Sequence, residues 1–219
     1  MKPQTMKHGA MKHGALKPRT MKPGAMKIVG LTGGIGMGKS TAAAAFRRAR
    51  IPVFDADATV HRLQGQGGRA LPAIEAAFPG TVRDNRLDRA ALRAAVLGHP
   101  AALTRLEAIV HPLVRAEERR FLARARRAGS RAVVLDIPLL FETGGRRTDL
   151  VVVVSAPRDV QVHRVRLRRR MSTADVAAVL ARQMPDAEKR RRADVVVRTG
   201  LSRHHAQRRL RRLIRELLA

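Results

Sequence analysis

The chain has 219 residues, 45% of them apolar, and carries 45 Lys and Arg against 17 Asp and Glu, for a formal net charge of +28. This apolar content excludes a wholly disordered chain, and no apolar run reaches the roughly 18 to 20 residues of a membrane span, so we expect no membrane partner. Cysteine is absent, which excludes disulfides and cysteine metal sites and predicts a reducing, cytoplasmic setting.

The excess positive charge comes mostly from Arg in segments whose apolar residues recur at helical spacing, such as RRFLARARRAG and HHAQRRLRRLIREL. We interpret this charge mainly as solvated helix faces. The chain has only five Phe and no Trp or Tyr on which bases could stack, so nucleic acid is not the expected partner. A substrate that bears polyphosphate and an incidental affinity for nucleic acid are the other interpretations of the charge.

The first 25 residues read in fives as MKPQT, MKHGA, MKHGA, LKPRT and MKPGA. This repeat contains six Lys or Arg and no acidic residue, and it has almost no apolar content beyond Met. Such a segment cannot bury enough surface to fold. We therefore predict a disordered basic extension over residues 1–26, with Met26 as the expected start of the functional chain.

The segment from Lys27 to Thr41 combines an apolar run, a glycine-rich loop and an Ala-rich helical pattern. The loop has the spacing Gly-x-x-x-x-Gly-Lys-Ser, in which backbone N–H groups turn inward on phosphate oxygens at the positive end of a helix. Strand, loop and helix in this order are the context that a nucleotide-binding P-loop requires. Lys39 is predicted to reach the β- and γ-phosphates of ATP, and the Ser40 hydroxyl to bind Mg²⁺. The predicted ATP-binding residues of the loop are Gly34, Ile35, Gly36, Met37, Gly38, Lys39, Ser40 and Thr41. The side chain of Met37 is expected to matter little, because the backbone does the binding.

A second short apolar run ends in two carboxylates, Asp55 and Asp57. If the chain stays extended, residues two apart point the same way, toward the place of a phosphoryl acceptor. A carboxylate there can accept the proton of an attacking hydroxyl or hold Mg²⁺ through water. Asp57 can also cap the helix that follows, and the two roles are compatible.

Residues 58–130 contain only helical patterns, so we predict a helical insertion after the second strand. Its last segment is one long helix or two, because Pro112 disfavours the helical conformation at His111. His111 is a candidate for the acceptor site, although it can equally be a packing contact before the proline.

Three further apolar strands follow, the first of them ending at Asp136. Strands that alternate with helices predict an α/β fold of the P-loop NTPase type, with a five-stranded parallel sheet between helical layers. Asp136 is then the natural carboxylate for Mg²⁺ beside Ser40. The basic helical stretch with Arg164 and Arg168, one turn apart, could close over the nucleotide as a lid, although either Arg can instead be a solvated charge.

Five motifs together resemble the dephospho-coenzyme A kinase family: VGLTGGIGMGKST, VFDAD, HPLV, DIPLLFE and the RQMP…KRRRAD segment. The similarity extends from Met26 to the C-terminus. It implies transfer of phosphate from ATP, with Mg²⁺, to the ribose 3′-hydroxyl of dephospho-coenzyme A, the final step of coenzyme A biosynthesis.

The resemblance also implies roles for individual residues. The catalytic residues would be Asp57 as the base, Lys39, and Arg164 as the nucleotide-binding arginine, and the acceptor would contact Asp55, Asp57, His111, Leu139 and Leu140. The kinase core would comprise residues 27–57 and 131–219, with a lid at about 163–185, and residues 58–130 would form the acceptor lobe. Two departures from the family pattern are Met37, where Ser is usual, and the turn at Thr199 and Gly200, which leaves the adenine contacts open.

The nearest alternative is another small-molecule P-loop kinase of the shikimate-kinase type, which also carries two Asp after its second strand but lacks DIPLLFE. A GTPase would need the guanine-reading motif Asn-Lys-x-Asp, and the only Asn of the chain is Asn85, in a different context. A basic nucleic-acid-binding module rests on charge alone and would show steeply salt-dependent binding.

Deletion of residues 1–25 should leave kinase activity intact, because the repeat carries none of the predicted site residues. ADP release by the full-length and shortened chains, measured at equal protein concentration, checks this expectation. Loss of activity in the shortened chain would show that the repeat is more than an extension.

Overall fold

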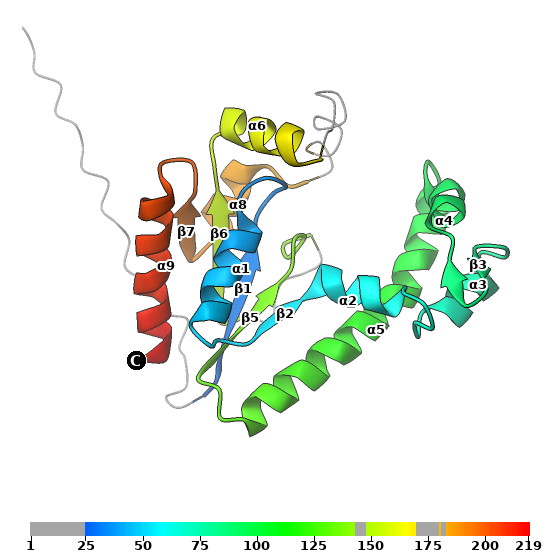
Figure 1. Ribbon diagram of the computed structural model, residues 1–219, viewed down its shortest axis with the longest axis horizontal. Coiled ribbons are helices and arrows are strands. Elements are labelled where there is room, and N and C mark those ends of the chain that lie inside the picture. The colour runs from blue at the N-terminus through cyan, green and yellow to red at the C-terminus, as the bar shows by residue number, and fades with distance from the viewer. Residues whose placement is uncertain (1–24, 143–147, 170–179, 181–182) are drawn as a thin grey trace, which may run out of the picture.

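A computed structural model describes residues 25–142, 148–169, 180 and 183–219 (Figure 1). Residues 1–24 of the predicted extension lie outside these residues, as does much of the predicted lid. The central sheet has five strands in the order β2-β5-β1-β6-β7, and all of its pairings are parallel. The strands are β1 (Lys27–Thr32), β2 (Val53–Asp55), β5 (Ala132–Asp136), β6 (Leu150–Ser155) and β7 (Val195–Arg198). The five-stranded parallel sheet predicted from the apolar runs is confirmed.

Helices cover both faces of the sheet and bury its Val-rich and Leu-rich strands. On one face, α1 (Lys39–Arg48) and α9 (Arg203–Leu218) pack against β1, β6 and β7 through a core that includes Phe46 and Leu213. On the other face, the C-terminal half of α5 (Pro100–Arg127) packs Leu122 and Ala125 against β5. Among the described residues, two further helices, α6 (Arg158–Arg169) and α8 (Asp186–Arg192), lie between β6 and β7 in the sequence. The result is the three-layer arrangement expected for continuous apolar parallel strands.

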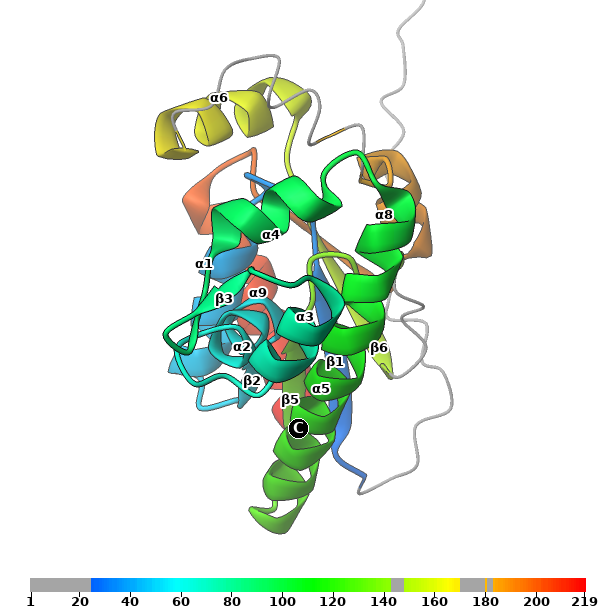
Figure 2. The ribbon, with the colours of Figure 1, turned by 90° about the vertical axis from the view of Figure 1, so that its right-hand side faces the viewer.

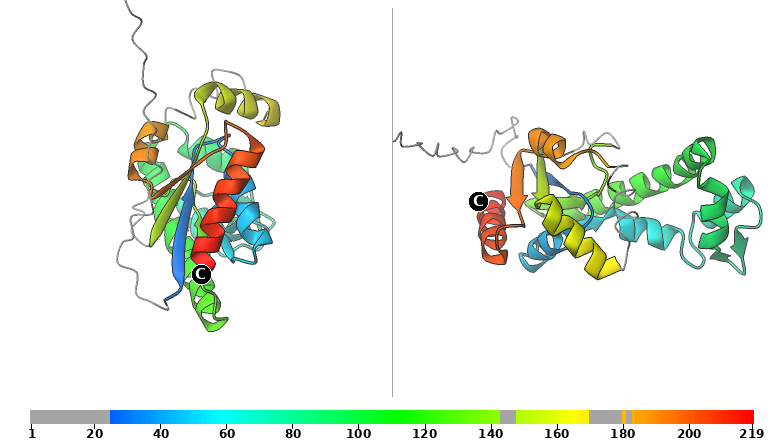
Figure 3. Two further views of the ribbon diagram at one scale, coloured as in Figure 1. Left: turned by 90° about the vertical axis from the view of Figure 1, so that its left-hand side faces the viewer. Right: turned by 90° about the horizontal axis from the view of Figure 1, so that it is seen from above.

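A helical lobe projects from one end of the sheet (Figures 1 and 2). It consists of α2 (Ala56–Leu63), α3 (Leu71–Ala77), α4 (Arg89–Val96) and the N-terminal half of α5. These helices share a core of their own, which includes Leu63, Ile74, Phe78 and Leu92. Seen from above, the lobe and α9 lie at opposite ends of the molecule (Figure 3).

The prediction of helices alone in residues 58–130 is wrong at one point. Strands β3 (Val82–Arg83) and β4 (Arg86–Leu87) form a small antiparallel hairpin. Its turn residues Asp84 and Asn85 both have positive φ, 48° and 57°. Asp and Asn tolerate this conformation better than most residues, and two-residue hairpin turns require it. Strands of two residues are too short to show an alternating apolar pattern, so the Asp-Asn pair was the only signal available.

Helix α5 is continuous through Pro112, which settles the choice between one helix and two. Apolar residues on both sides of the proline hold the helix in place. Val110 is buried just before it, and Leu113 and Val114 pack against the lobe core just after it. Packing along the helix therefore outweighs the hydrogen bond that Pro112 cannot donate. No helix in the described part of the chain is long and apolar enough to cross a membrane.

Replacing Phe46 by Ala should destabilise the sheet core, because this ring is fully buried between α1 and the strands. Loss of a buried Phe typically costs about 3 to 5 kcal/mol. Urea unfolding followed by circular dichroism measures the change. Leu103→Ala is the control, since Leu103 is 46% exposed on α5, and it should change the free energy of unfolding by less than about 0.5 kcal/mol. Similar losses in both variants would contradict the assignment of the core.

Candidate active site

The glycine-rich loop connects β1 to the start of α1 at the carboxyl edge of the sheet. Gly36 and Gly38 have φ of 75° and 92°, a region that side chains other than glycine rarely enter. A Cβ on Gly36 would also lie 2.7 Å from the Cγ2 atom of Val165 in α6. Gly38 is the N-cap of α1, and no side chain caps this helix end. The loop therefore presents backbone N–H groups at a helix N-terminus, as phosphate binding requires.

An ion pair between Lys39 and Asp136 joins the start of α1 to the end of β5. The Lys39 Nζ atom lies 2.6 Å from Asp136 Oδ1, and the side chain of Asp136 is only 4% exposed. Burial raises the pKa of Asp136 above its ordinary value, while the hydrogen bond and positive charge of Lys39 oppose that rise. Lys39 is thus held at the mouth of the loop by a carboxylate on the neighbouring strand.

Parallel register brings Asp55 to the same edge of the sheet. Asp55 pairs with Asp136 across β2 and β5, and its side chain forms an ion pair with Arg47 at 3.6 Å. The Asp55 carboxylate also accepts a hydrogen bond from the backbone N–H of Ala58, at 2.9 Å. Asp55 is therefore the N-cap of α2, the role that sequence analysis considered for Asp57.

Asp57 lies in the first turn of α2, because the helix begins at Ala56. The expectation of an extended chain from Asp55 to Asp57 is therefore wrong, and strand alternation does not set the direction of the second carboxylate. A carboxylate in the first turn of a helix is favoured by the helix dipole, and Asp57 is exposed. It is thus available to a molecule bound between the loop and the helical lobe.

The other predicted acceptor residues differ in their exposure. Leu140 is buried, and its Cδ2 atom would lie 2.7 Å from a Cβ on Gly30, so its side chain packs over β1 in the core. Leu139, next to it, is 41% exposed. His111 is half-buried within α5. Leu139 and His111 therefore stay candidates, whereas the side chain of Leu140 supports the loop from inside the protein.

Arg164 of α6 links the end of β7 to the glycine loop. Its guanidinium donates hydrogen bonds to the Thr199 hydroxyl at 3.2 Å and to the Thr199 carbonyl at 2.8 Å. The same hydroxyl donates to the carbonyl of Met37 in the loop, at 2.7 Å. Thr199 thus lies beside the loop, and its contact with adenine stays open. The side chain of Arg168, the other predicted lid arginine, lies outside the described residues.

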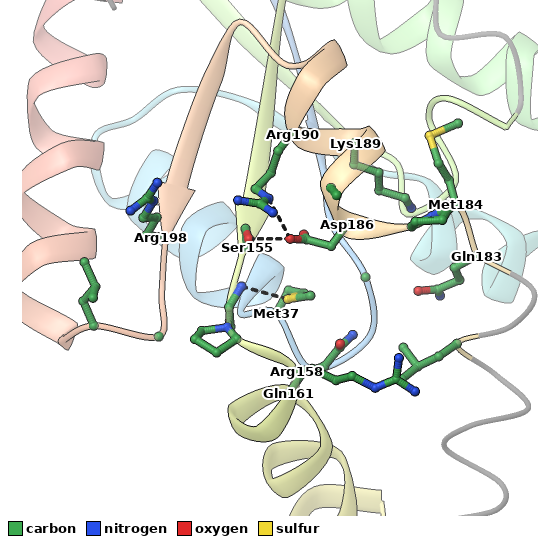
Figure 4. A pocket seen from close by; sticks show the side chains of 18 residues that line it. Met37, Ser155, Arg158, Gln161, Gln183, Met184, Asp186, Lys189, Arg190 and Arg198 are labelled. Carbon is green, nitrogen blue, oxygen red and sulfur yellow. Dashed lines mark hydrogen bonds and ion pairs between the residues drawn. The ribbon is translucent and has the colours of Figure 1, made fainter. Parts of the chain in front are cut away.

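Met37 is more than a variable position of the loop. Its side chain is buried, and the sulfur accepts a hydrogen bond from the backbone N–H of Ala156, at 2.9 Å. The expectation that this side chain matters little is wrong for the packing of the loop, because Met37 anchors it to the end of β6 (Figure 4).

Sequence analysis missed two glutamines that contact the loop. Gln161, from α6, and Gln183, which precedes α8, both line a cavity of about 850 Å³ that Gly34 also lines (Figure 4). Gln183 belongs to the RQMP motif, which could have drawn attention to it. Gln161 is one of several polar residues in an Arg-rich helix, so no sequence signal distinguishes it.

Within the described residues, no group of three or more His, Asp or Glu could hold a metal ion by itself. Ser40 is exposed at the start of α1, and Asp136 and Asp55 lie at the same sheet edge. Mg²⁺ in kinases is usually held by one or two protein oxygens together with substrate phosphates and water. The residues present fit such a shared site.

A family model for dephospho-CoA kinase matches residues 27–210. The dephospho-CoA kinase of Gluconobacter oxydans is 58% identical over 196 residues, which span 87% of this chain and 98% of the relative. That of Paramagnetospirillum magneticum is 66% identical over 165 residues, spanning 75% of this chain and 78% of the relative.

Two solved structures have a fold similar to that of this chain. A crystal structure from Thermus thermophilus has a TM-score of 0.79 and 37% identity, and it covers 89% of this chain and 98% of its own. The dephospho-CoA kinase of Campylobacter jejuni, at 24% identity, shares the fold with a TM-score of 0.60 over 88% of this chain and 98% of its own. The P-loop edge of the sheet, the length of the family match and the identity to these relatives lead to one conclusion: the chain belongs to the dephospho-CoA kinase family.

Proposed function

We propose that this chain transfers the γ-phosphate of ATP to the ribose 3′-hydroxyl of dephospho-coenzyme A, giving coenzyme A and ADP. The observation that carries the proposal is the convergence of the glycine loop, the Lys39–Asp136 pair and the start of α2 at one edge of the sheet. Donor phosphates and an acceptor hydroxyl must meet at such an edge, since ligands of open α/β sheets bind at the carboxyl ends of the strands.

On the donor side, the loop N–H groups and Lys39 hold the phosphates of ATP, while Arg164 stabilises the charge that develops during transfer. Lys39 is 17% exposed, so its ammonium group can face a phosphate while it stays next to Asp136. Arg164 is positioned by Thr199, which also contacts the loop. Arg168 stays a prediction for the same role.

On the acceptor side, Asp57 is the general base. It accepts the proton of the 3′-hydroxyl as the oxygen attacks the γ-phosphorus, and ADP leaves with the bridging oxygen. Asp55 acts beside it and fixes the start of α2 through its cap. The helical lobe, with His111, and the exposed Leu139 would receive the rest of the acceptor.

Mg²⁺, bound by the phosphates with Ser40 and Asp136, would supply positive charge that neutralises the phosphate oxygens. Ser40 would hold it from the first turn of α1, and Asp136 from the end of β5. Whichever of them binds directly, the buried Asp136 keeps its second role of orienting Lys39.

The choice of acceptor tests the proposed function. Coupled ADP release should be fast with dephospho-coenzyme A and near background with shikimate or a nucleoside monophosphate, offered one at a time and in competition. Preference for either of the other two acceptors would overturn the proposal, and ATP turnover that needs no acceptor would do so as well.

Asp57→Asn should lower turnover by about a hundredfold, the usual scale for loss of a general base, while ATP binding survives. The amide keeps the size of the side chain but cannot accept the proton. Steady-state kinetics and calorimetric titration with ATP separate the two effects. Asp84→Asn is the matched control, because Asp84 is exposed in the hairpin turn of the lobe and Asn tolerates its positive φ. Near-normal turnover in Asp57→Asn would remove this residue from the base role.

A further inference from the structure

Both backbone polar groups of Ile35, in the glycine loop, bond to side-chain amides from outside the loop. The Ile35 carbonyl accepts a hydrogen bond from Gln161 Nε2 at 2.8 Å, and the Ile35 N–H donates to Gln183 Oε1 at 3.3 Å. The two glutamines come from different segments, one in α6 and the other just before α8 (Figure 4). Twenty-one residues separate them in the sequence, so their meeting at one residue is a product of the fold.

The chemistry of the peptide groups determines which end of each amide faces Ile35. A carbonyl only accepts and a backbone N–H only donates, so Gln161 must present its NH₂ group and Gln183 its oxygen. Both amide ends also lie close to Gly34. A Cβ on Gly34 would be 3.1 Å from Gln161 Nε2 and 3.1 Å from Gln183 Oε1. The two amides therefore occupy the same small region beside the loop.

Each glutamine is itself held by its surroundings. Gln161 is 5% exposed, and its backbone carbonyl would lie only 2.9 Å from a Cβ on Gly36, so α6 packs directly on the loop. The residue after Gln183, Met184, donates its N–H to Glu142 Oε1 at 3.1 Å. Glu142 also forms an ion pair at 3.1 Å with Lys189, whose side chain is 1% exposed. The end of the DIPLLFE segment thus fixes the place of Gln183.

The hydrogen bond from Gln161 to the Ile35 carbonyl also sets the direction of the Gly36 N–H. In a planar trans peptide, the C=O of one residue and the N–H of the next point in opposite directions. Because the Ile35 carbonyl is turned toward Gln161, the Gly36 N–H is turned away from it. Gly36 has φ of 75° and no side chain, so without this hydrogen bond little would prevent the peptide from flipping. The Gln161 amide therefore decides which way one predicted phosphate-binding N–H group points.

We propose that Gln161 and Gln183 are positioning residues for the ATP phosphates: they lock the two peptide groups of Ile35 and so keep the Gly36 N–H directed into the phosphate site. The inference rests on the proposed function in one respect, that the loop binds the phosphates of ATP. Neither glutamine needs to touch the nucleotide. Loss of the lock should weaken ATP use and leave the acceptor side unaffected.

A pair of charge-matched substitutions tests the lock. Gln183→Glu keeps an oxygen that can accept from the Ile35 N–H, whereas Gln161→Glu replaces the required donor by a carboxylate that faces a carbonyl. Both variants add one negative charge at the same place beside Gly34, so repulsion of the ATP phosphates is common to both. Gln161→Glu should therefore raise KM for ATP about tenfold more than Gln183→Glu does, the scale of one hydrogen bond lost to a buried group. KM for dephospho-coenzyme A should stay within about twofold in both.

A pair of uncharged substitutions tests the same hydrogen bonds without adding a negative charge. Met has nearly the shape of Gln but cannot donate, and its sulfur accepts only weakly, so Gln161→Met breaks one hydrogen bond and Gln183→Met weakens the other. Both should raise KM for ATP by about three- to tenfold. If Gln161→Glu does not fold, this pair decides alone, and values within twofold of the unaltered chain would overturn the proposal.

Three results would overturn the proposal when the Glu pair folds. The first is an equal rise in KM for ATP in the two Glu variants, and the second is a larger rise in Gln183→Glu than in Gln161→Glu. The third is an equal rise in KM for both substrates together with a lowered thermal midpoint, which would indicate a merely structural role. The activity of the unaltered chain with dephospho-coenzyme A distinguishes failure of this proposal from failure of the proposed function. If the unaltered chain does not phosphorylate dephospho-coenzyme A, the proposed function is wrong. If the unaltered chain is active and the Gln161 and Gln183 variants have its KM for ATP, only the positioning role of the two glutamines is wrong.

Discussion

The site depends above all on a buried carboxylate at the end of a central strand. Asp136 ends β5, between β1 and β2, and almost none of its side chain reaches solvent. A buried carboxylate needs a partner, because leaving water costs it several kcal/mol. Lys39 supplies that partner from the first turn of α1. The ion pair therefore ties the helix that follows the glycine loop to the strand beside it, and it places a positive charge at the mouth of the loop.

Motifs that are far apart in the sequence meet around the glycine loop. Glu142, at the end of DIPLLFE, contacts Met184 and Lys189 of the RQMP…KRRRAD segment. Gln183 of that segment reaches Ile35 in the loop, and Gln161 reaches the same residue from α6. Burial alone would raise the pKa of Glu142, but the hydrogen bond from Met184 and the nearby Lys189 lower it below its ordinary value. Glu142 is therefore ionised at neutral pH, as its contact with the buried Lys189 requires. This chain of contacts gives a physical reason for the motifs to occur together.

Helix α5 connects the two parts of the molecule that a two-substrate kinase must bring together. Its N-terminal half completes the core of the helical lobe, and its C-terminal half packs on the sheet. A continuous helix is stiff, because its backbone hydrogen bonds lie within the segment itself, so its two halves keep a fixed relative position. The passage through Pro112 without a break therefore matters for function, because it keeps the lobe in a defined place relative to the glycine loop.

Much of this protein follows from local sequence patterns. The parallel sheet, the loop and the candidate residues Lys39, Asp57 and Asp136 could be predicted, because apolar runs, glycine spacing and strand ends act over a few neighbouring residues. The hairpin at Asp84 and Asn85 was missed because its strands are only two residues long. The cap at Asp55 is a local contact with the N–H of Ala58, and it was assigned to Asp57 because the start of α2 was placed too late in the sequence. Only the tertiary structure decided the burial of the Met37 and Leu140 side chains and the hydrogen bonds of Gln161 and Gln183 to Ile35. Each depends on contacts between residues distant in the chain, and no local pattern distinguishes a glutamine that reaches a loop from one that faces water.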